Sequence, residues 1–167
     1  MGISAVRVGQ GFDIHRFSDD PSRALILGGV HFVGERGLEG HSDADVIAHA
    51  CADALLGAAG LGDIGQHFAD TDPAWKDIDS LKILDQVSVM VRAQGWLIGN
   101  IDCSVVCEQP KLAPRRDEMQ DKLSKTAGTT VSVKGRRAEG LGALGRQEGI
   151  ACWAVAVLFQ VDHRSEV

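Results

Sequence analysis

The chain has 167 residues, enough for one domain with a sizeable hydrophobic core, and its 44% hydrophobic and 24% charged residues are typical of a globular protein. With 17 basic and 23 acidic residues the net charge is −6 at pH 7, which argues against general nucleic-acid binding because that requires a basic face. A local basic cluster at residues 134–137 could still hold a small anionic ligand.

The strand signals begin at the N-terminus. Residues 4–12 have the pattern of a strand that ends in glycines. Residues 24–26 and 30–33 predict a hairpin around Gly28 and Gly29.

A helix follows the hairpin. Ser42 and Asp45 form a capping box with Asp in place of Glu, and they predict a helix that runs to about Leu56. Residues 60–73 are too rich in Gly, Asp and Pro for regular structure, so we expect a functional loop there that could act as a lid.

The second half of the chain alternates helices with strands. Capping and helix-breaking residues place helices at 79–95 and 114–128, and alternating or apolar runs place strands at 101–107, 129–134 and 150–161. We therefore predict an α+β fold, an α/β sandwich in which one mixed sheet of four to five strands packs on a layer of about three helices. The whole of residues 1–167 is expected to form a single domain.

The cysteines and the apolar runs indicate the compartment. Cys51, Cys103, Cys107 and Cys152 form no C-x-x-C pair and lie in apolar stretches, so buried thiols in a reducing compartment are expected. No apolar run reaches transmembrane length, and the first residues lack the apolar core of a signal peptide. We expect a cytoplasmic protein that does not bind membranes.

Three potential metal ligands stand out. Asp13 and His15 alternate in the first strand, so their side chains point to the same side, and His49 lies on the first helix. Two histidines and one carboxylate form a catalytic zinc set whose fourth position is left for substrate or water. A strand-end Asp-x-His and a lone helical histidine are also common without a metal, so the spacing alone leaves both interpretations open.

Further polar residues surround these candidates. Asp45 and Asp53 share a helix face with His49 and could fix its tautomer, or simply be capping and solvated residues. His41 and Ser42 precede the helix N-terminus, where they would suit a phosphate contact, although His41 could equally be an exposed loop residue.

Several other charged residues fit either a structural or a functional role. Asp63, Asp70 and Asp72 could form turns or take part in a site. Glu139 follows the basic cluster, where a hard cation such as Mg²⁺ would be expected. Lys111 also fits an ordinary surface position.

Conspicuous motifs run through nearly the whole chain: residues 11–15, 41–45 with His49, 53–59, 61–65, 70–73, 99–102, 109–111, 145–146 and 148–151. In their number, order and spacing, they closely resemble those of the 2-C-methyl-D-erythritol 2,4-cyclodiphosphate synthase family of the non-mevalonate isoprenoid pathway. The resemblance implies a homotrimer with each active site between neighbouring subunits.

The resemblance also implies a reaction, that of a phosphorus–oxygen lyase. The 2-phosphate of 4-diphosphocytidyl-2-C-methyl-D-erythritol 2-phosphate attacks the β-phosphorus, CMP leaves, and 2-C-methyl-D-erythritol 2,4-cyclodiphosphate forms. Both reacting groups are anionic, so cations must reduce their repulsion. Zn²⁺, one per active site, would polarise a β-phosphate oxygen, while Mg²⁺ or Mn²⁺ would bridge the diphosphate.

Site residues follow from the same resemblance. Asp13, His15 and His49 would hold Zn²⁺ and Glu139 would hold Mg²⁺; with His41 they are the expected catalytic residues. The positions around the methylerythritol phosphate are His41, Ser42, Asp53, Asp63, Gly65, Phe68 and Asp70. The positions around the cytidine, contributed by the adjacent subunit, are Cys107, Pro110, Lys111, Leu112 and Ala113.

The chain departs from the family just before Glu139. Many members have threonines there that contact the phosphates, whereas this chain has Gly135-Arg136-Arg137-Ala138. The arginines could neutralise phosphate or point to solvent while the backbone makes the contacts. We include Arg137 among the expected substrate-binding residues.

The family also has an apolar channel on the trimer axis that can take isoprenoid diphosphates. Phe12, Gly142 and Arg146 match its mouth, and Arg146 is included as a ligand-binding residue. The usual aromatic residue is replaced by Ala143. An isoprenoid diphosphate is thus a possible additional ligand.

Two other functions fit the same residues. A zinc phosphohydrolase would transfer the β-phosphate to water at an open site and release a linear product. A metal-binding or purely structural trimer would tolerate replacement of Glu139, Asp63 and Lys111 with no loss beyond stability.

Overall fold

The computed structural model describes residues 3–69 and 71–161. Its main sheet has the strand order β1-β6-β4-β5, formed by Ile3–Arg16 (β1), Gly149–Val161 (β6), Leu97–Val106 (β4) and Thr130–Arg136 (β5). β6 is antiparallel to both neighbours, whereas β4 and β5 are parallel, so the sheet is mixed. The hairpin of β2 (Leu25–Leu27) and β3 (Val30–Phe32) forms where it was predicted.

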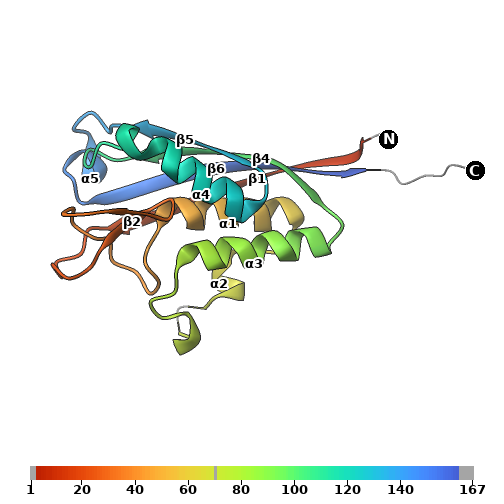
Figure 1. Cartoon of the computed structure of the whole chain (residues 1–167), viewed down its shortest axis with the longest axis horizontal. Helices are drawn as coiled ribbons and strands as arrows, with labels where there is room; N and C mark the ends of the chain where they lie inside the picture. Colours follow the sequence, from red (N-terminus) through yellow and green to blue (C-terminus); the bar gives the residue numbers. More distant parts are fainter. Residues whose placement is uncertain (1–2, 70, 162–167) are drawn as a thin grey trace, which may run out of the picture.

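Three long helices pack beside this sheet (Figure 1). Among the described residues they are α1 (Val46–Ala59), α3 (Ser80–Ala93) and α4 (Arg116–Ala127). The shorter helical elements are α2 (Ile64–His67), α5 (Gly142–Gly145) and the 3₁₀ turns Pro73–Trp75 and Ala113–Arg115. The predicted α+β fold with a mixed four-stranded sheet is confirmed.

The first strand and the first helix approach each other unusually closely. A Cβ built on Gly11 would lie 2.0 Å from the Ala50 carbonyl oxygen, and one on Gly9 would lie 2.1 Å from the Ala54 carbonyl oxygen. Only glycines allow the α1 backbone to lie this near to β1. Asp13 continues the same face of β1, so the strand places it beside the N-terminal half of α1.

The start of α1 differs from the sequence prediction. Asp45, not Ser42, is the N-cap, and its carboxylate accepts hydrogen bonds from Ile47 N at 3.0 Å and Ala48 N at 3.2 Å. The same carboxylate accepts from Gly28 N at 2.9 Å and Gly29 N at 2.6 Å in the β2–β3 turn. A buried carboxylate that serves four backbone donors is a better cap than the Ser42 hydroxyl expected for that role.

Two other boundaries also differ. β1 continues to Arg16, four residues beyond its predicted end, so the strand contains both Asp13 and His15. Residues 60–73, predicted to lack regular structure, contain the single helical turn of α2, whose N-cap is Asp63. Asp63 Oδ1 accepts a hydrogen bond from Gln66 N, which lets this short turn form despite its poor composition.

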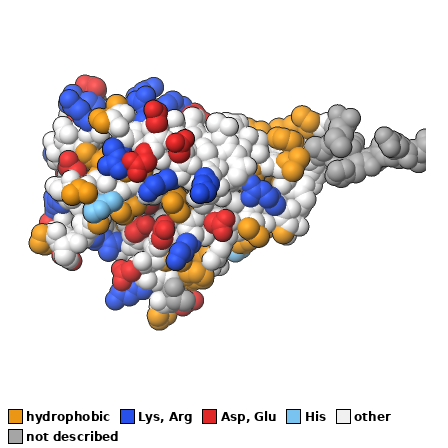
Figure 2. All heavy atoms as spheres, viewed as in Figure 1, with side chains coloured by type: hydrophobic (Ala, Val, Ile, Leu, Met, Phe, Trp, Pro, Cys, Tyr) orange, Lys and Arg blue, Asp and Glu red, His pale blue; other side chains and the backbone are white. Residues whose placement is uncertain are grey.

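One face of the sheet carries no helix and is apolar along β1 and β6. Its exposed large side chains are Val6, Val8, Phe12, Ile14, Trp153 and Val155. The rings of Phe12 and Trp153 lie 4.8 Å apart across the two strands. Figure 2 shows apolar side chains gathered at the narrow end of the molecule, where β1 and β6 extend past the helices. Within the described residues, no helix has the length and apolarity needed to span a membrane.

We predict that Gly11→Ala destabilises the protein by about 1–3 kcal/mol, because its Cβ would push α1 away from β1. Gly57→Ala, on α1 itself, is the matched control: its Cβ would meet only Gln10 O at 3.8 Å. That change should stabilise the protein by about 0.5–1 kcal/mol through helix propensity. Urea unfolding at one fixed protein concentration measures both, and equal effects from the two variants would contradict the packing constraint.

Candidate active site

Asp13, His15 and His49 converge on one point. Asp13 Oδ2 lies 3.0 Å from His49 Nδ1 and 3.1 Å from His15 Nε2. One ligand atom from each residue lies within 4.8 Å of the other two, a geometry found for no other group of three such side chains in the described part of the chain. β1 supplies two ligands on one face, and α1 supplies the third from the end of its first turn.

The donor set fits a divalent metal ion such as Zn²⁺. His15 Nε2 is buried and has no hydrogen-bond partner among the described residues, although Asp13 lies nearby, so a buried ring nitrogen is left to bind something else. Although burial opposes ionisation, the two adjacent imidazoles, His15 and His49, hold the pKa of Asp13 well below its usual range. An ionised carboxylate and two imidazoles are typical zinc ligands.

The second ring nitrogen of His49 has partners that the sequence did not indicate. His49 Nε2 lies 2.8 Å from Ser80 Oγ and 3.2 Å from Ser42 Oγ. The carboxylates expected in this place are used elsewhere: Asp45 caps α1, and Asp53 accepts a hydrogen bond from Ile64 N. Burial raises the pKa of Asp53 above its usual value.

The three ligands open onto a cavity of about 410 Å³. Four of the predicted substrate-binding residues line it, namely His41, Ser42, Gly65 and Phe68. Asp53 and Asp63 line a smaller adjoining cavity of about 150 Å³, together with Asp13 and His49. The structure thus brings these residues together, while Asp70 lies outside the described residues.

The sequence analysis missed several residues of this cavity. Gly40, Ile64, Trp75 and Ile83 also line it. The Trp75 ring meets the Phe68 ring edge-on, with centroids 5.1 Å apart, and forms part of its apolar wall. Trp75 lies just after the predicted functional loop 60–73. An aromatic residue in that position is the feature of the sequence that could have identified it as a site residue.

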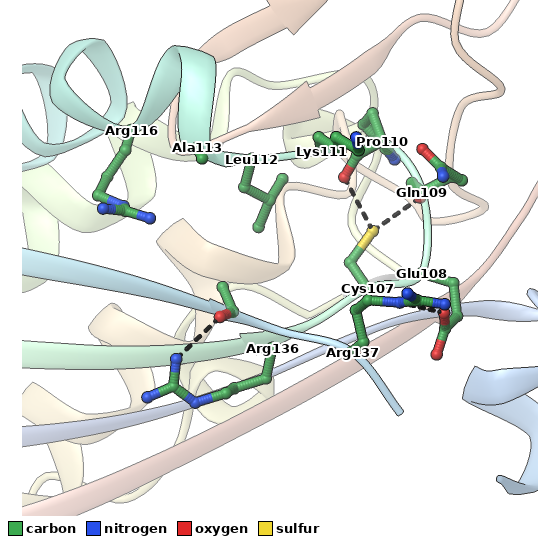
Figure 3. Close-up of a pocket in the computed structure, with 11 residues that line it drawn as sticks. Cys107, Glu108, Gln109, Pro110, Lys111, Leu112, Ala113, Arg116, Arg136 and Arg137 are labelled. Carbon is green, nitrogen blue, oxygen red and sulfur yellow. Dashed lines mark hydrogen bonds and ion pairs between the residues drawn. The ribbon is translucent and has the colours of Figure 1, made fainter. Parts of the chain in front are cut away.

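A second cavity of about 280 Å³ lies where β4 and β5 end (Figure 3). The residues predicted to bind the cytidine, Cys107, Pro110, Lys111, Leu112 and Ala113, all line it, and so does Arg137, which was predicted to bind the substrate. Cys107 Sγ donates a hydrogen bond to Gln109 O at 2.7 Å. Burial raises the pKa of Cys107 to about 12, so the thiol stays protonated and acts as a structural donor.

Glu108 in this second cavity was not identified from the sequence. Its carboxylate accepts a hydrogen bond from Arg137 Nε at 2.9 Å, and this contact holds the pKa of Glu108 below its usual value. Arg116 and Arg136 also line the cavity, so its positive charge comes from these two residues as well as from Lys111 and Arg137.

Two predicted residues lie apart from both cavities. Glu139 is exposed in the turn after β5, with a φ of 53°, and does not line either of them. Arg146 Nε donates to Glu148 Oε1 at 2.7 Å in the loop before β6. Their roles in binding stay predictions.

Comparison with known proteins gives a consistent result. The sequence profile of the YgbB family matches residues 6–159. A 2-C-methyl-D-erythritol 2,4-cyclodiphosphate synthase of Nostoc sp. is 52% identical over 164 residues, which cover 96% of this chain and 98% of that protein.

Solved structures agree with this assignment. The structure titled IspF (Plasmodium falciparum) CDP complex superposes with a TM-score of 0.82 and 31% identity, over 96% of this chain and all of that one. The bifunctional IspDF of Campylobacter jejuni has a TM-score of 0.90 and 39% identity; the match covers 96% of this chain but only 44% of that longer protein. The chain belongs to the YgbB family and is a relative of the 2-C-methyl-D-erythritol 2,4-cyclodiphosphate synthases.

Proposed function

We propose that this chain converts 4-diphosphocytidyl-2-C-methyl-D-erythritol 2-phosphate into 2-C-methyl-D-erythritol 2,4-cyclodiphosphate and CMP, as a phosphorus–oxygen lyase of the non-mevalonate isoprenoid pathway. The observation that carries the proposal is the cluster of Asp13, His15 and His49 at the mouth of a 410 Å³ cavity. Relatives about half identical over nearly the whole chain are named as synthases of this product.

The side chains of the first cavity suit the methylerythritol phosphate half of the substrate. Asp53 and Asp63 can accept hydrogen bonds from sugar hydroxyls, and Phe68 offers apolar surface to the methyl-bearing carbon skeleton. His41 at the rim can donate to a phosphate oxygen. Holding the 2-phosphate near the β-phosphorus converts the cyclisation into a proximity-driven step.

The reaction forms one bond and breaks another. A 2-phosphate oxygen forms a bond to the β-phosphorus, and the bond from that phosphorus to the CMP oxygen breaks, so that CMP leaves with the electron pair. Metal ions bound at Asp13, His15 and His49, and at Glu139, would supply Lewis-acid stabilisation of the diphosphate charge. Lys111 and Arg137 add fixed positive charge where the nucleotide phosphates would lie.

The second cavity suits the cytidine half. It is lined by apolar residues at Pro110 and Leu112 and by cationic side chains at its rim. A relative with 31% identity has been solved with CDP, by its title. Backbone groups of residues 107–113 would bind the base, as the resemblance to the family implies.

We further propose that the active site lies between subunits of a homotrimer. Two of the candidate metal ligands lie on β1 at one edge of the sheet, whereas the second cavity lies beside β5 at the other edge, about 14 Å away across three strand spacings. A head-to-tail ring of three chains would bring the β1 edge of one subunit to the β5 edge of the next. The exposed apolar face of β1 and β6 supports this assembly, because it needs a partner surface.

In such a ring the apolar faces would surround a common axis, where Phe12 lies on the wall and Arg146 would supply a charge for an isoprenoid diphosphate. Calorimetric titration of the protein with geranyl diphosphate should give heat of binding. Absence of heat would remove this ligand from the proposal.

The proposed function predicts metal-dependent release of CMP. Purified protein should release CMP from the diphosphocytidyl substrate, lose this activity on chelation, and regain it with Zn²⁺ and Mg²⁺. His49→Ala should be inactive because it removes a metal ligand, and Lys111→Ala should be weakened because it removes charge from the nucleotide cavity.

Mixing these two variants tests whether the site is shared. After subunit exchange at equal amounts, a site joins one intact metal half and one intact nucleotide half in about one case in four, so activity should rise to about a quarter of the wild-type value. A mixture no more active than the two variants measured separately would place the whole site within one chain.

The Arg137 guanidinium also gives a prediction. Arg137→Ala removes the cationic partner of Glu108 and leaves its negative charge uncompensated beside the expected phosphates. KM for the substrate should therefore rise by about tenfold, with a smaller change in kcat. Steady-state kinetics measures this, and an unchanged KM would exclude Arg137 from the site.

A further inference from the structure

We infer that Ser80 is a positioning residue for His49 and that Asp43 orients Ser80. His49 Nδ1 points to the Asp13 carboxylate, while the opposite ring nitrogen, Nε2, lies 2.8 Å from Ser80 Oγ. Ser80 Oγ in turn donates to Asp43 Oδ1 in a short hydrogen bond. The inference rests on the proposed function in one respect: it takes the ligand of Nδ1 to be a metal ion.

The chemistry of the three side chains fixes which of them donates in each hydrogen bond of the series His49–Ser80–Asp43. An ionised carboxylate can only accept, so the Ser80 hydroxyl must give its proton to Asp43. The lone pairs of Ser80 Oγ are then left to accept from the Nε2–H of His49. With a metal ion on Nδ1, the remaining ring proton of His49 is on Nε2, where Ser80 Oγ is placed to accept it.

The second hydroxyl near His49 is the weaker candidate. Ser42 Oγ lies 3.2 Å from Nε2 and already accepts a hydrogen bond from Ala44 N at 3.1 Å. It lies 3.3 Å from Ser80 Oγ, so it adjoins the chain of hydrogen bonds rather than forming part of it. The imidazole has a single proton to donate at Nε2, and the shorter contact is to Ser80.

The backbone around these residues holds the chain of hydrogen bonds in place. Ser80 is fully buried and is the first residue of α3. Asp43 Oδ2 accepts from Ser80 N at 3.2 Å, while Asp43 Oδ1 accepts from Asp45 N at 3.2 Å, beside the start of α1. Asp43 therefore connects the beginnings of two helices and points its carboxylate at the hydroxyl nearer to His49 Nε2.

This arrangement has a defined effect on metal binding. A carboxylate that acts on a ligating imidazole through a hydrogen bond fixes the ring and raises its basicity, and loss of such a partner typically weakens metal binding by about 10–100-fold. Ser80 would therefore contribute to metal affinity through His49. It would not contact the metal ion itself or the residues of β1 that line the substrate cavity.

The test compares Ser80→Ala with Ser88→Ala. Ser88 is buried on the same helix, and its Oγ has no hydrogen-bond partner among the described residues, so it is a matched loss of one hydroxyl. Zn²⁺ affinity is measured by competition with a chromophoric chelator, and the exchange of the His49 Nε2–H proton with water by ¹H–¹⁵N NMR of the Zn²⁺-loaded protein. Ser80→Ala should bind Zn²⁺ about 10–100-fold more weakly and exchange this proton faster than the wild type.

The controls separate a positioning role from a structural one. Ser88→Ala should keep wild-type affinity and wild-type exchange of the His49 Nε2–H proton, and Ser80→Thr, which keeps a hydroxyl, should recover most of the affinity. Asp43→Asn, which preserves shape, should give a smaller loss in the same direction and replaces Ser80→Ala if that variant does not fold.

Two outcomes would be decisive against the inference. If Ser80→Ala, or Asp43→Asn in its place, retained both wild-type Zn²⁺ affinity and wild-type exchange of the Nε2–H proton, Ser80 would not position His49. If the wild-type protein itself bound no Zn²⁺, the proposed function would fail and the inference with it, whereas wild-type affinity in Ser80→Ala would overturn the inference alone.

Discussion

The close contact between α1 and β1 is the constraint on which the candidate site depends. Gly9 and Gly11 let the helix backbone approach the strand, and the same strand face continues into the two ligands Asp13 and His15. Asp45 ties the start of α1 to the β2–β3 turn, which fixes where the helix begins. Together these contacts place the His49 ring 3.0 Å from the Asp13 carboxylate without any residue between them.

The electrostatics of the site follow from this packing. Burial alone would favour a neutral Asp13, but two imidazoles keep the pKa of Asp13 low, so the carboxylate stays charged in a partly enclosed place. The three potential ligands already lie close together, and Ser80 and Asp43 extend hydrogen bonds from the opposite side of the His49 ring. A site arranged in this way would lose little entropy on binding a metal ion.

The sequence allowed much of this to be predicted where the information was local. The alternation of Asp13 and His15, the β2–β3 hairpin and the helix end at Gly128 depend on neighbouring residues, and the structure contains all three. The capping prediction at Ser42 was wrong because Asp45 gains two further donors from a turn distant in sequence. Ser80, Trp75 and Glu108 were missed for the same reason, since only the fold brings Ser80 to His49 and the other two to their cavities.

The most direct test of the central claim is ³¹P NMR of the purified protein with 4-diphosphocytidyl-2-C-methyl-D-erythritol 2-phosphate, Zn²⁺ and Mg²⁺. The account predicts CMP together with a coupled pair of signals from a cyclic diphosphate. CMP with a linear bisphosphate would show that water, not the 2-phosphate, attacks, and the chain would be a hydrolase. An unchanged spectrum from folded, metal-loaded protein would contradict the proposed reaction altogether.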